Sequence, residues 1–138
     1  MALFETQSNG ATEKIYHDAE ITNRIIGCAI EVHKALGPGL LESVYESCLA
    51  YEIIKTGLRV ERQKPLPVIY KGIVFDEGFR LDLHVEEKVV VELKCVEKML
   101  PIHEAQIYTY LKLSGNKIGL LINFNTKLLK EGLVRIIC

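Results

Sequence analysis

Two β-strand patterns joined by a short polar turn constrain the fold of this chain more than any other feature. Residues 79 to 85 alternate apolar and polar side chains, and residues 89 to 96 are rich in valine. Between them stands the polar segment Glu86-Glu87-Lys88, which is typical of a tight connection. The two segments are therefore predicted to form a β-hairpin.

The predicted hairpin gathers two carboxylates and an amine. Asp82 and Glu92 are expected to lie across from each other, and side chains alternate along a strand, so Glu92 and Lys94 share a face while Leu93 points the other way. Metal-dependent phosphodiester nucleases use such a set, because Mg²⁺ needs only one or two protein carboxylates together with substrate phosphate oxygens. The lysine would orient the nucleophile or offset developing charge. A cross-strand salt bridge on a solvated face is the alternative, and for an isolated match it is the commoner outcome.

Hydrophobic periodicity predicts the remaining elements. One helix starts near Asp18 and stops at Gly37-Pro38-Gly39, and a second ends near Gly57. The other predictions are strands at 58 to 64, 66 to 71 and 73 to 85, a helix from Pro101 to about Ser114-Gly115, a buried strand at 119 to 123, and a strand at 133 to 137.

The predicted order is α-α-β-β-β-β-α-β-β, an α/β (α+β) fold with a mixed sheet flanked by helices. A right-handed crossover makes the strand at 118 to 123 parallel to that at 89 to 96. We expect a loosely ordered lead-in at 1 to 17 and a single domain at 18 to 138.

The overall charge limits how nucleic acid is bound. The formal net charge of the 138 residues is -1, so phosphate contacts must come from local cations, for which Arg80, Lys98 and Lys112 are the candidates. The four cysteines do not have zinc-ligand spacing. With no signal-peptide pattern and no apolar run long enough for a bilayer, a cytoplasmic location without membrane contact is expected.

Polar residues on two helices extend the hairpin cluster. Gln106 and Tyr110 are spaced i, i+4, so they share a helix face that is able to close over the acids. Glu42 falls close to an apolar stripe, which is explained either by a buried polar partner or by the favourable dipole of a helix's first turn. The sequence leaves both explanations open.

Residues 37 to 45, Gly-Pro-Gly-Leu-Leu-Glu-Ser-Val-Tyr, resemble the signature of the GxxExxY proteins, a prokaryotic family of the PD-(D/E)XK nuclease superfamily named for Gly39, Glu42 and Tyr45. The similarity runs from about residue 20 to the C-terminus and includes residues 31 to 36, 80 to 82, 92 to 94, 106 to 112 and 120 to 124. It implies a restriction-endonuclease-like fold. Leu81 stands where the superfamily usually has proline, a change that the superfamily tolerates.

The resemblance also implies roles for individual residues. Asp82 and Glu92 match the metal-binding acids, Lys94 the catalytic lysine, Glu42 the first-helix acid, and Gln106 with Tyr110 the QxxxY helix of recombination-type nucleases. We therefore expect a nuclease that depends on Mg²⁺ (or Mn²⁺) and cuts DNA, rather than RNA, with metal-activated water. The alternatives are a nucleic-acid-binding module with little turnover, and an interaction protein that forms a homodimer through an apolar edge strand.

Overall fold

The computed structural model describes the backbone of residues 2 to 138 and the side chains of residues 18 to 138. Its helices and strands are α1 (Ala2–Leu36), α2 (Glu42–Lys55), β1 (Val60–Pro65), β2 (Val68–Tyr70), β3 (Ile73–Phe75), β4 (Arg80–Val85), β5 (Val89–Lys94), α3 (Pro101–Ser114), β6 (Ile118–Asn123), the 3₁₀ helix η1 (Leu129–Gly132) and β7 (Leu133–Ile137). Helix α1 thus begins well before the start predicted at Asp18. The division into a lead-in at 1 to 17 and a domain at 18 to 138 remains a prediction.

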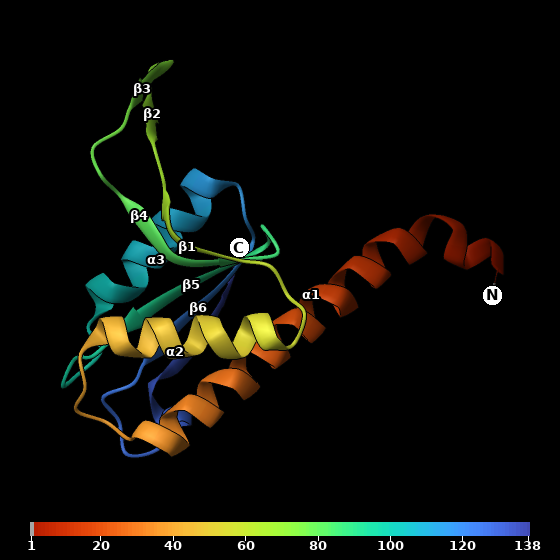
Figure 1. Ribbon diagram of the computed structural model, residues 1–138. Helices are drawn as coiled ribbons and strands as arrows, with labels where there is room; N and C mark the ends of the chain where they lie inside the picture. Colours follow the sequence, from red (N-terminus) through yellow and green to blue (C-terminus); the bar gives the residue numbers. More distant parts are fainter. Residues whose placement is uncertain (1) are drawn as a thin grey trace.

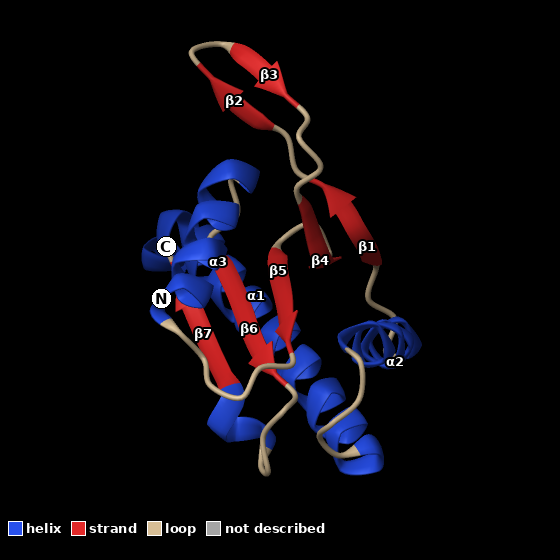
Figure 2. Ribbon diagram, turned by 90° about the vertical axis from the view of Figure 1, so that its left-hand side faces the viewer, coloured by secondary structure: helices blue, strands red, loops and turns tan. Residues whose placement is uncertain are grey.

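A five-stranded sheet in the order β1-β4-β5-β6-β7 forms the centre of the molecule (Figure 2). Strands β5 and β6 are parallel, with Val90 opposite Gly119, and the other neighbours are antiparallel. The mixed sheet and the parallel crossover through α3 were both predicted correctly. Strand β1 lies at an edge and ends at Pro65, where a residue without a backbone N–H is tolerated.

The single strand predicted over 73 to 85 is in fact two strands, so five strands rather than four precede α3. The chain leaves β3 at Phe75 and enters β4 at Arg80, and Gly78 between them has a φ of 84°. Strands β2 and β3 pair only with each other and rise from the sheet as a separate hairpin (Figures 1 and 2). The prediction was wrong because it took the polar residues Asp76-Glu77-Gly78, which separate the apolar residues of β3 from the alternating residues of β4, as part of one strand.

Helices cover both faces of the sheet. Helices α1 and α2 pack on one face against Leu83, Val91 and Leu93, while α3 packs on the other against Val90 and Leu121 (Figure 1). Burial on both faces explains why the valine-rich strand β5 is apolar at successive positions. In the part of the chain that the structure describes, no helix is long and apolar enough to cross a membrane.

Candidate active site

The site lies where β4 and β5 part. Their pairing runs from Val85 opposite Val89 to Leu83 opposite Val91 and stops before the next position, where Asp82 faces Glu92. At that point the backbone N–H groups donate to side-chain carboxylates instead of to the carbonyl groups of the neighbouring strand. The N–H of Asp82 donates to Oε1 of Glu92 at 3.1 Å, and the N–H of Leu93 donates to Oδ2 of Asp82 at 2.9 Å. Both carboxylates are thereby held at the mouth of the opening.

Glu92 is a buried acid beside another acid. It is 4% exposed, and burial, reinforced by the negative charge of Asp82, raises the pKa of Glu92 to about 9 against the weaker opposing effect of Lys94. Burial also raises the pKa of Asp82, although the N–H of Leu93 favours its charged form. Two such carboxylates repel each other when both are ionised. A cation between them would remove that repulsion.

The donor set fits a hard divalent cation. Both side chains offer only oxygen, which Mg²⁺ and Mn²⁺ prefer, and two carboxylates suffice when water and substrate complete the shell. Among the described residues, no cluster of three or more His, Cys, Asp and Glu side chains is arranged to hold a metal ion. A cation bound at this opening would therefore have Asp82 and Glu92 as its protein ligands, with water and substrate completing the shell.

Helix α3 holds the lysine. Nζ of Lys94 donates to Oε1 of Gln106 at 3.0 Å, and Nε2 of Gln106 donates to the hydroxyl of Tyr110 at 3.1 Å. The two α3 residues share one helix face, as their spacing predicted. Next to them is a cavity of about 340 Å³, lined by Phe79, Lys94, Ile102, His103, Gln106, Thr109 and Tyr110. The ammonium group is thus held at one wall of a space beside the acids.

Glu42 approaches the same cluster from α2. It is the first residue of that helix and is exposed, so the buried partner considered from the sequence is not what holds it. Partial desolvation raises the pKa of Glu42, Asp82 raises it further, and Lys94 opposes the change. Glu42 therefore combines a first-turn position, favourable to the helix dipole, with an electrostatic coupling to Asp82 and Lys94.

Tyr45 fixes the loop that delivers Glu42. Its fully buried ring stacks on Phe124 with ring centres 4.5 Å apart. Its hydroxyl donates to the carbonyl of Gly37 and accepts the N–H of Leu40 at 3.2 Å. Gly39 has a φ of 99°, which residues with a side chain rarely adopt. Of the three signature residues, Gly39 and Tyr45 therefore shape the loop, and Glu42 lies close enough to Asp82 for their charges to interact.

Sequence reasoning missed two residues of this cluster. Glu46 is 7% exposed and accepts hydrogen bonds from Nε and Nη2 of Arg62 at 3.2 and 3.0 Å. Nε2 of Gln63 donates to Glu46 and, at 3.4 Å, to Oδ1 of Asp82. A signal for Glu46 was present, because it stands one turn before Ala50 on the buried side of α2, where a carboxylate needs partners.

The comparisons with known proteins agree with this geometry. A family model described as the PD-(D/E)XK nuclease superfamily matches residues 19 to 136. The chain belongs to the PD-(D/E)XK nuclease superfamily. No curated protein and no solved structure matches it. Membership supports nuclease activity on nucleic acid, and nucleases of this superfamily typically use divalent metal ions.

The predicted phosphate contacts of this superfamily member come from three places along the chain. Arg80 starts β4, Lys98 lies between β5 and α3, and Lys112 is in the last turn of α3; all three are exposed. Their role remains a prediction. His84, two residues after Asp82 on the same strand, is buried, and its ring bonds to Asn116 at 2.6 Å and to Lys64 at 3.0 Å.

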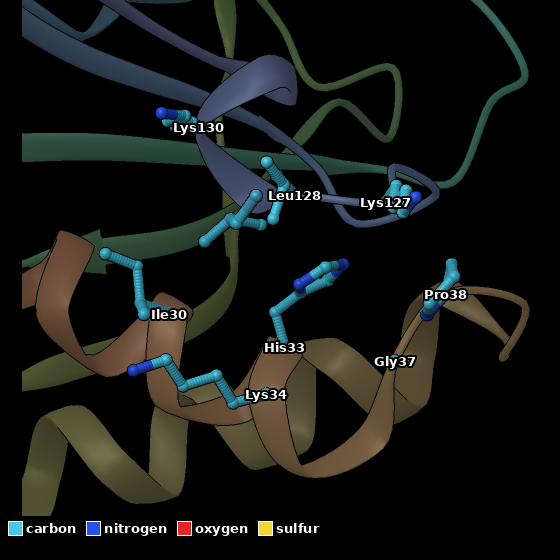
Figure 3. A pocket seen from close by; sticks show the side chains of 9 residues that line it. Ile30, His33, Lys34, Gly37, Pro38, Lys127, Leu128 and Lys130 are labelled. Atoms are coloured by element: carbon cyan, nitrogen blue, oxygen red, sulfur yellow. The ribbon is translucent and has the colours of Figure 1, made fainter.

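A larger cavity of about 500 Å³ lies away from the acids of this nuclease-superfamily domain (Figure 3). It separates the C-terminal part of α1 from the segment that enters η1, and it is lined by Ile30, His33, Lys34, Gly37, Pro38, Lys127, Leu128, Leu129 and Lys130. None of its lining residues is a carboxylate. This cavity has a basic rim but no carboxylate that could hold a divalent cation.

Proposed function

We propose that this domain is a Mg²⁺-dependent (or Mn²⁺-dependent) nuclease that hydrolyses phosphodiester bonds of DNA. The observation that carries the proposal is the pairing of Asp82 with buried Glu92 at the opening between β4 and β5, with Lys94 on the same strand as Glu92. The sequence signature around Gly39, Glu42 and Tyr45 further supports assignment to the GxxExxY family.

Each residue has a distinct part in the proposed reaction. Asp82 and Glu92 would hold the cation, which when bound would polarise a phosphate oxygen and lower the pKa of a water molecule. Lys94 orients that water and offsets negative charge that develops on the phosphate. Gln106, itself bonded to Tyr110, keeps the ammonium group of Lys94 in place. Glu42 adds a further carboxylate beside Asp82 and Lys94.

A cleavage assay tests the proposal. End-labelled and circular DNA, with matched RNA, are incubated with the protein and Mg²⁺ or Mn²⁺, and with EDTA as the control. We expect metal-dependent cleavage of DNA that Asp82→Ala abolishes together with Mn²⁺ binding. Cleavage of circular DNA would establish endonuclease action. Metal and DNA binding without cleavage would support the alternative of a nucleic-acid-binding module, and cleavage of RNA alone would contradict the proposed substrate.

A homodimer is a second candidate, favoured by the separate hairpin of β2 and β3. Most of its apolar side chains are exposed, including Ile69, Ile73 and Val74 at 65%, 58% and 62%. An isolated two-stranded hairpin is marginal in water, and exposed apolar strands pair readily with another chain. Sedimentation of the wild type and of Ile73→Lys tests this: a dimer that the substitution dissociates supports the candidate, and a wild-type monomer at tens of micromolar excludes it.

A further inference from the structure

We propose that Gln63 is a positioning residue for Asp82, and that Glu46 holds Gln63 in place. This inference rests on the proposed function, since it concerns how the chain prepares one of its two metal-binding acids. It assigns a role to residues of β1 and α2 that lie outside the cluster expected from the sequence.

The backbone of β1 is distorted at Gln63. Gln63 has a φ of 49°, a value that residues with a side chain rarely adopt. The pairing of β1 with β4 is continuous on both sides of it, with Arg62 opposite Leu83 and Lys64 opposite Leu81. Gln63 therefore stands opposite Asp82, and the distortion occurs at the one position of β1 that faces this acid.

The distortion changes the direction of the side chains. In a regular strand Arg62 and Gln63 would point to opposite faces. Here both bond to Glu46 of α2. The two residues that flank this pair behave in the same way: Lys64 bonds to Glu61 at 3.2 Å, although in a regular strand residues three apart point to opposite faces. Alternation is thus reversed at Gln63, and the reversal turns its amide toward α2 and Asp82.

The chemistry of the acceptors fixes the orientation of the amide. Ionised carboxylates only accept hydrogen bonds, so the NH₂ group of Gln63 and not its oxygen must face Glu46 and Asp82. One N–H goes to Oε1 of Glu46 and the other to Oδ1 of Asp82 at 3.4 Å. The second bond is long and weak by itself. The bond to Glu46 is held in place, because Glu46 is buried and its other carboxylate oxygen accepts a hydrogen bond from Arg62.

Asp82 is consequently held from two sides. Oδ2 accepts the N–H of Leu93 in β5, and Oδ1 accepts the amide of Gln63 in β1. Each oxygen keeps a further lone pair for a cation. Partners of this kind orient metal ligands, and their removal typically weakens metal binding about 10- to 100-fold.

The experiment measures Mn²⁺ affinity by the loss of the free-ion EPR signal, on the whole 138-residue chain without substrate. Gln63→Gly keeps a backbone suited to positive φ and removes the amide. Lys71→Gly is the matched control, since Lys71 has a φ of 50° in the turn between β2 and β3. We expect Gln63→Gly to bind Mn²⁺ about tenfold more weakly, whereas Lys71→Gly binds as the wild type does. Gln63→Met, which retains side-chain volume, replaces Gln63→Gly if the latter does not fold.

A double-mutant cycle tests the part of Glu46. Because Glu46 is proposed to act through Gln63, Glu46→Gln should weaken Mn²⁺ binding in the wild type and have no further effect in Gln63→Gly. Additive effects would overturn this part, and unchanged affinity in folded Gln63→Gly and Gln63→Met would overturn the whole inference while leaving the proposed function intact. A wild type that binds no Mn²⁺ would overturn the proposed function and this inference together.

Discussion

At the scale of single residues, the site is defined by two acids that the fold holds close together. Glu92 is buried next to Asp82, and the ammonium group of Lys94 donates to Gln106 on the neighbouring helix. Such an arrangement is costly for the fold without a cation and useful with one. The proposed function gives the lysine and the buried acid separate roles, so their removal should have different consequences.

Lys94→Ala should reduce cleavage about 100-fold or more while leaving Mn²⁺ binding nearly unchanged, because the proposed role of the amine is to act on water and phosphate rather than on the ion. The measurements are single-turnover cleavage of labelled DNA and Mn²⁺ titration on the same preparations. Lys55→Ala, at the exposed end of α2, is the control for loss of a lysine charge. Unchanged cleavage by Lys94→Ala would remove the lysine from the mechanism.

Glu92→Gln should change how stability depends on pH. The pKa of Glu92 is raised from 4.5 to about 9, so between these values the native state keeps a proton that the unfolded state has lost. Stability without metal therefore falls as pH rises through this range. The variant lacks this dependence and should melt at a higher temperature than the wild type near pH 9, with little difference near pH 4.5.

The measurement is thermal unfolding in EDTA across the range from pH 4.5 to about 9. Glutamine retains an oxygen able to accept the N–H of Asp82, so the variant should fold. Glu97→Gln removes an exposed carboxylate from the loop after β5 and serves as the control. Parallel pH profiles for wild type and Glu92→Gln would show that Glu92 is ionised in the native state at neutral pH.

The residues whose positions follow from the sequence are those governed by regular geometry. Strand alternation and hairpin pairing are sufficient to predict that Asp82, Glu92 and Lys94 lie together. Gln63 escaped prediction because its positive φ breaks that alternation, and the position holds none of the residues that usually indicate such a backbone, namely glycine, asparagine or aspartate. Glu46 gains its significance only through Arg62 and Gln63 on a different element.

At the scale of elements, the packing of α3 on β6 sets the distance between Lys94 and Gln106. Gly119 permits this contact, because a Cβ at that position would lie 2.8 Å from Cδ1 of Ile107 and 3.3 Å from Cδ1 of Leu111. Both neighbours are fully buried and have little room to move. The close approach of α3 to the sheet is therefore part of how the lysine is held.

Gly119→Ala should lower the free energy of unfolding by about 1–3 kcal/mol through overpacking. Ile107→Val removes the closest methyl group, so the double variant should be less destabilised than the two single changes added together. Urea denaturation measures both effects. Gly27→Ala, on an open face of α1, is the control and should stabilise by about 0.5–1 kcal/mol. If the losses of unfolding free energy in Gly119→Ala and Ile107→Val simply add in the double variant, α3 has room to shift away from β6.

Element boundaries were predicted well where one signal dominated. Pro101 and Gly115 mark the ends of α3, and the apolar run before Asn123 marks β6. The predicted start of α1 and the single strand across the bend between β3 and β4 were wrong. At the bend, Asp76, Glu77 and Gly78 interrupt the apolar residues, but the sequence did not show that β4 joins the central sheet whereas β3 does not.

At the scale of the whole molecule, a net charge of -1 gives no general attraction for a polyanion. The site itself is acidic, so the proposed DNA substrate would have to be held by cations placed around it. Two groups of cations are available: Arg80, Lys98 and Lys112 near β4 and α3, and Lys34, Lys127 and Lys130 at the separate cavity of Figure 3. They predict different paths for the substrate.

The salt dependence of DNA binding should distinguish these paths. If Arg80, Lys98 and Lys112 neutralise about three phosphates of duplex DNA, the slope of log affinity against log salt should be about -2 to -3. Lys98→Ala and Lys112→Ala should each flatten it by about one unit, whereas Lys127→Ala and Lys130→Ala should not. Fluorescence anisotropy measures the affinity. All variants also carry Lys94→Ala, so that the DNA is not cleaved during the titration. If only Lys127→Ala and Lys130→Ala flatten the slope, the substrate lies over the cavity of Figure 3. If none of the four substitutions changes the slope, DNA is not the ligand.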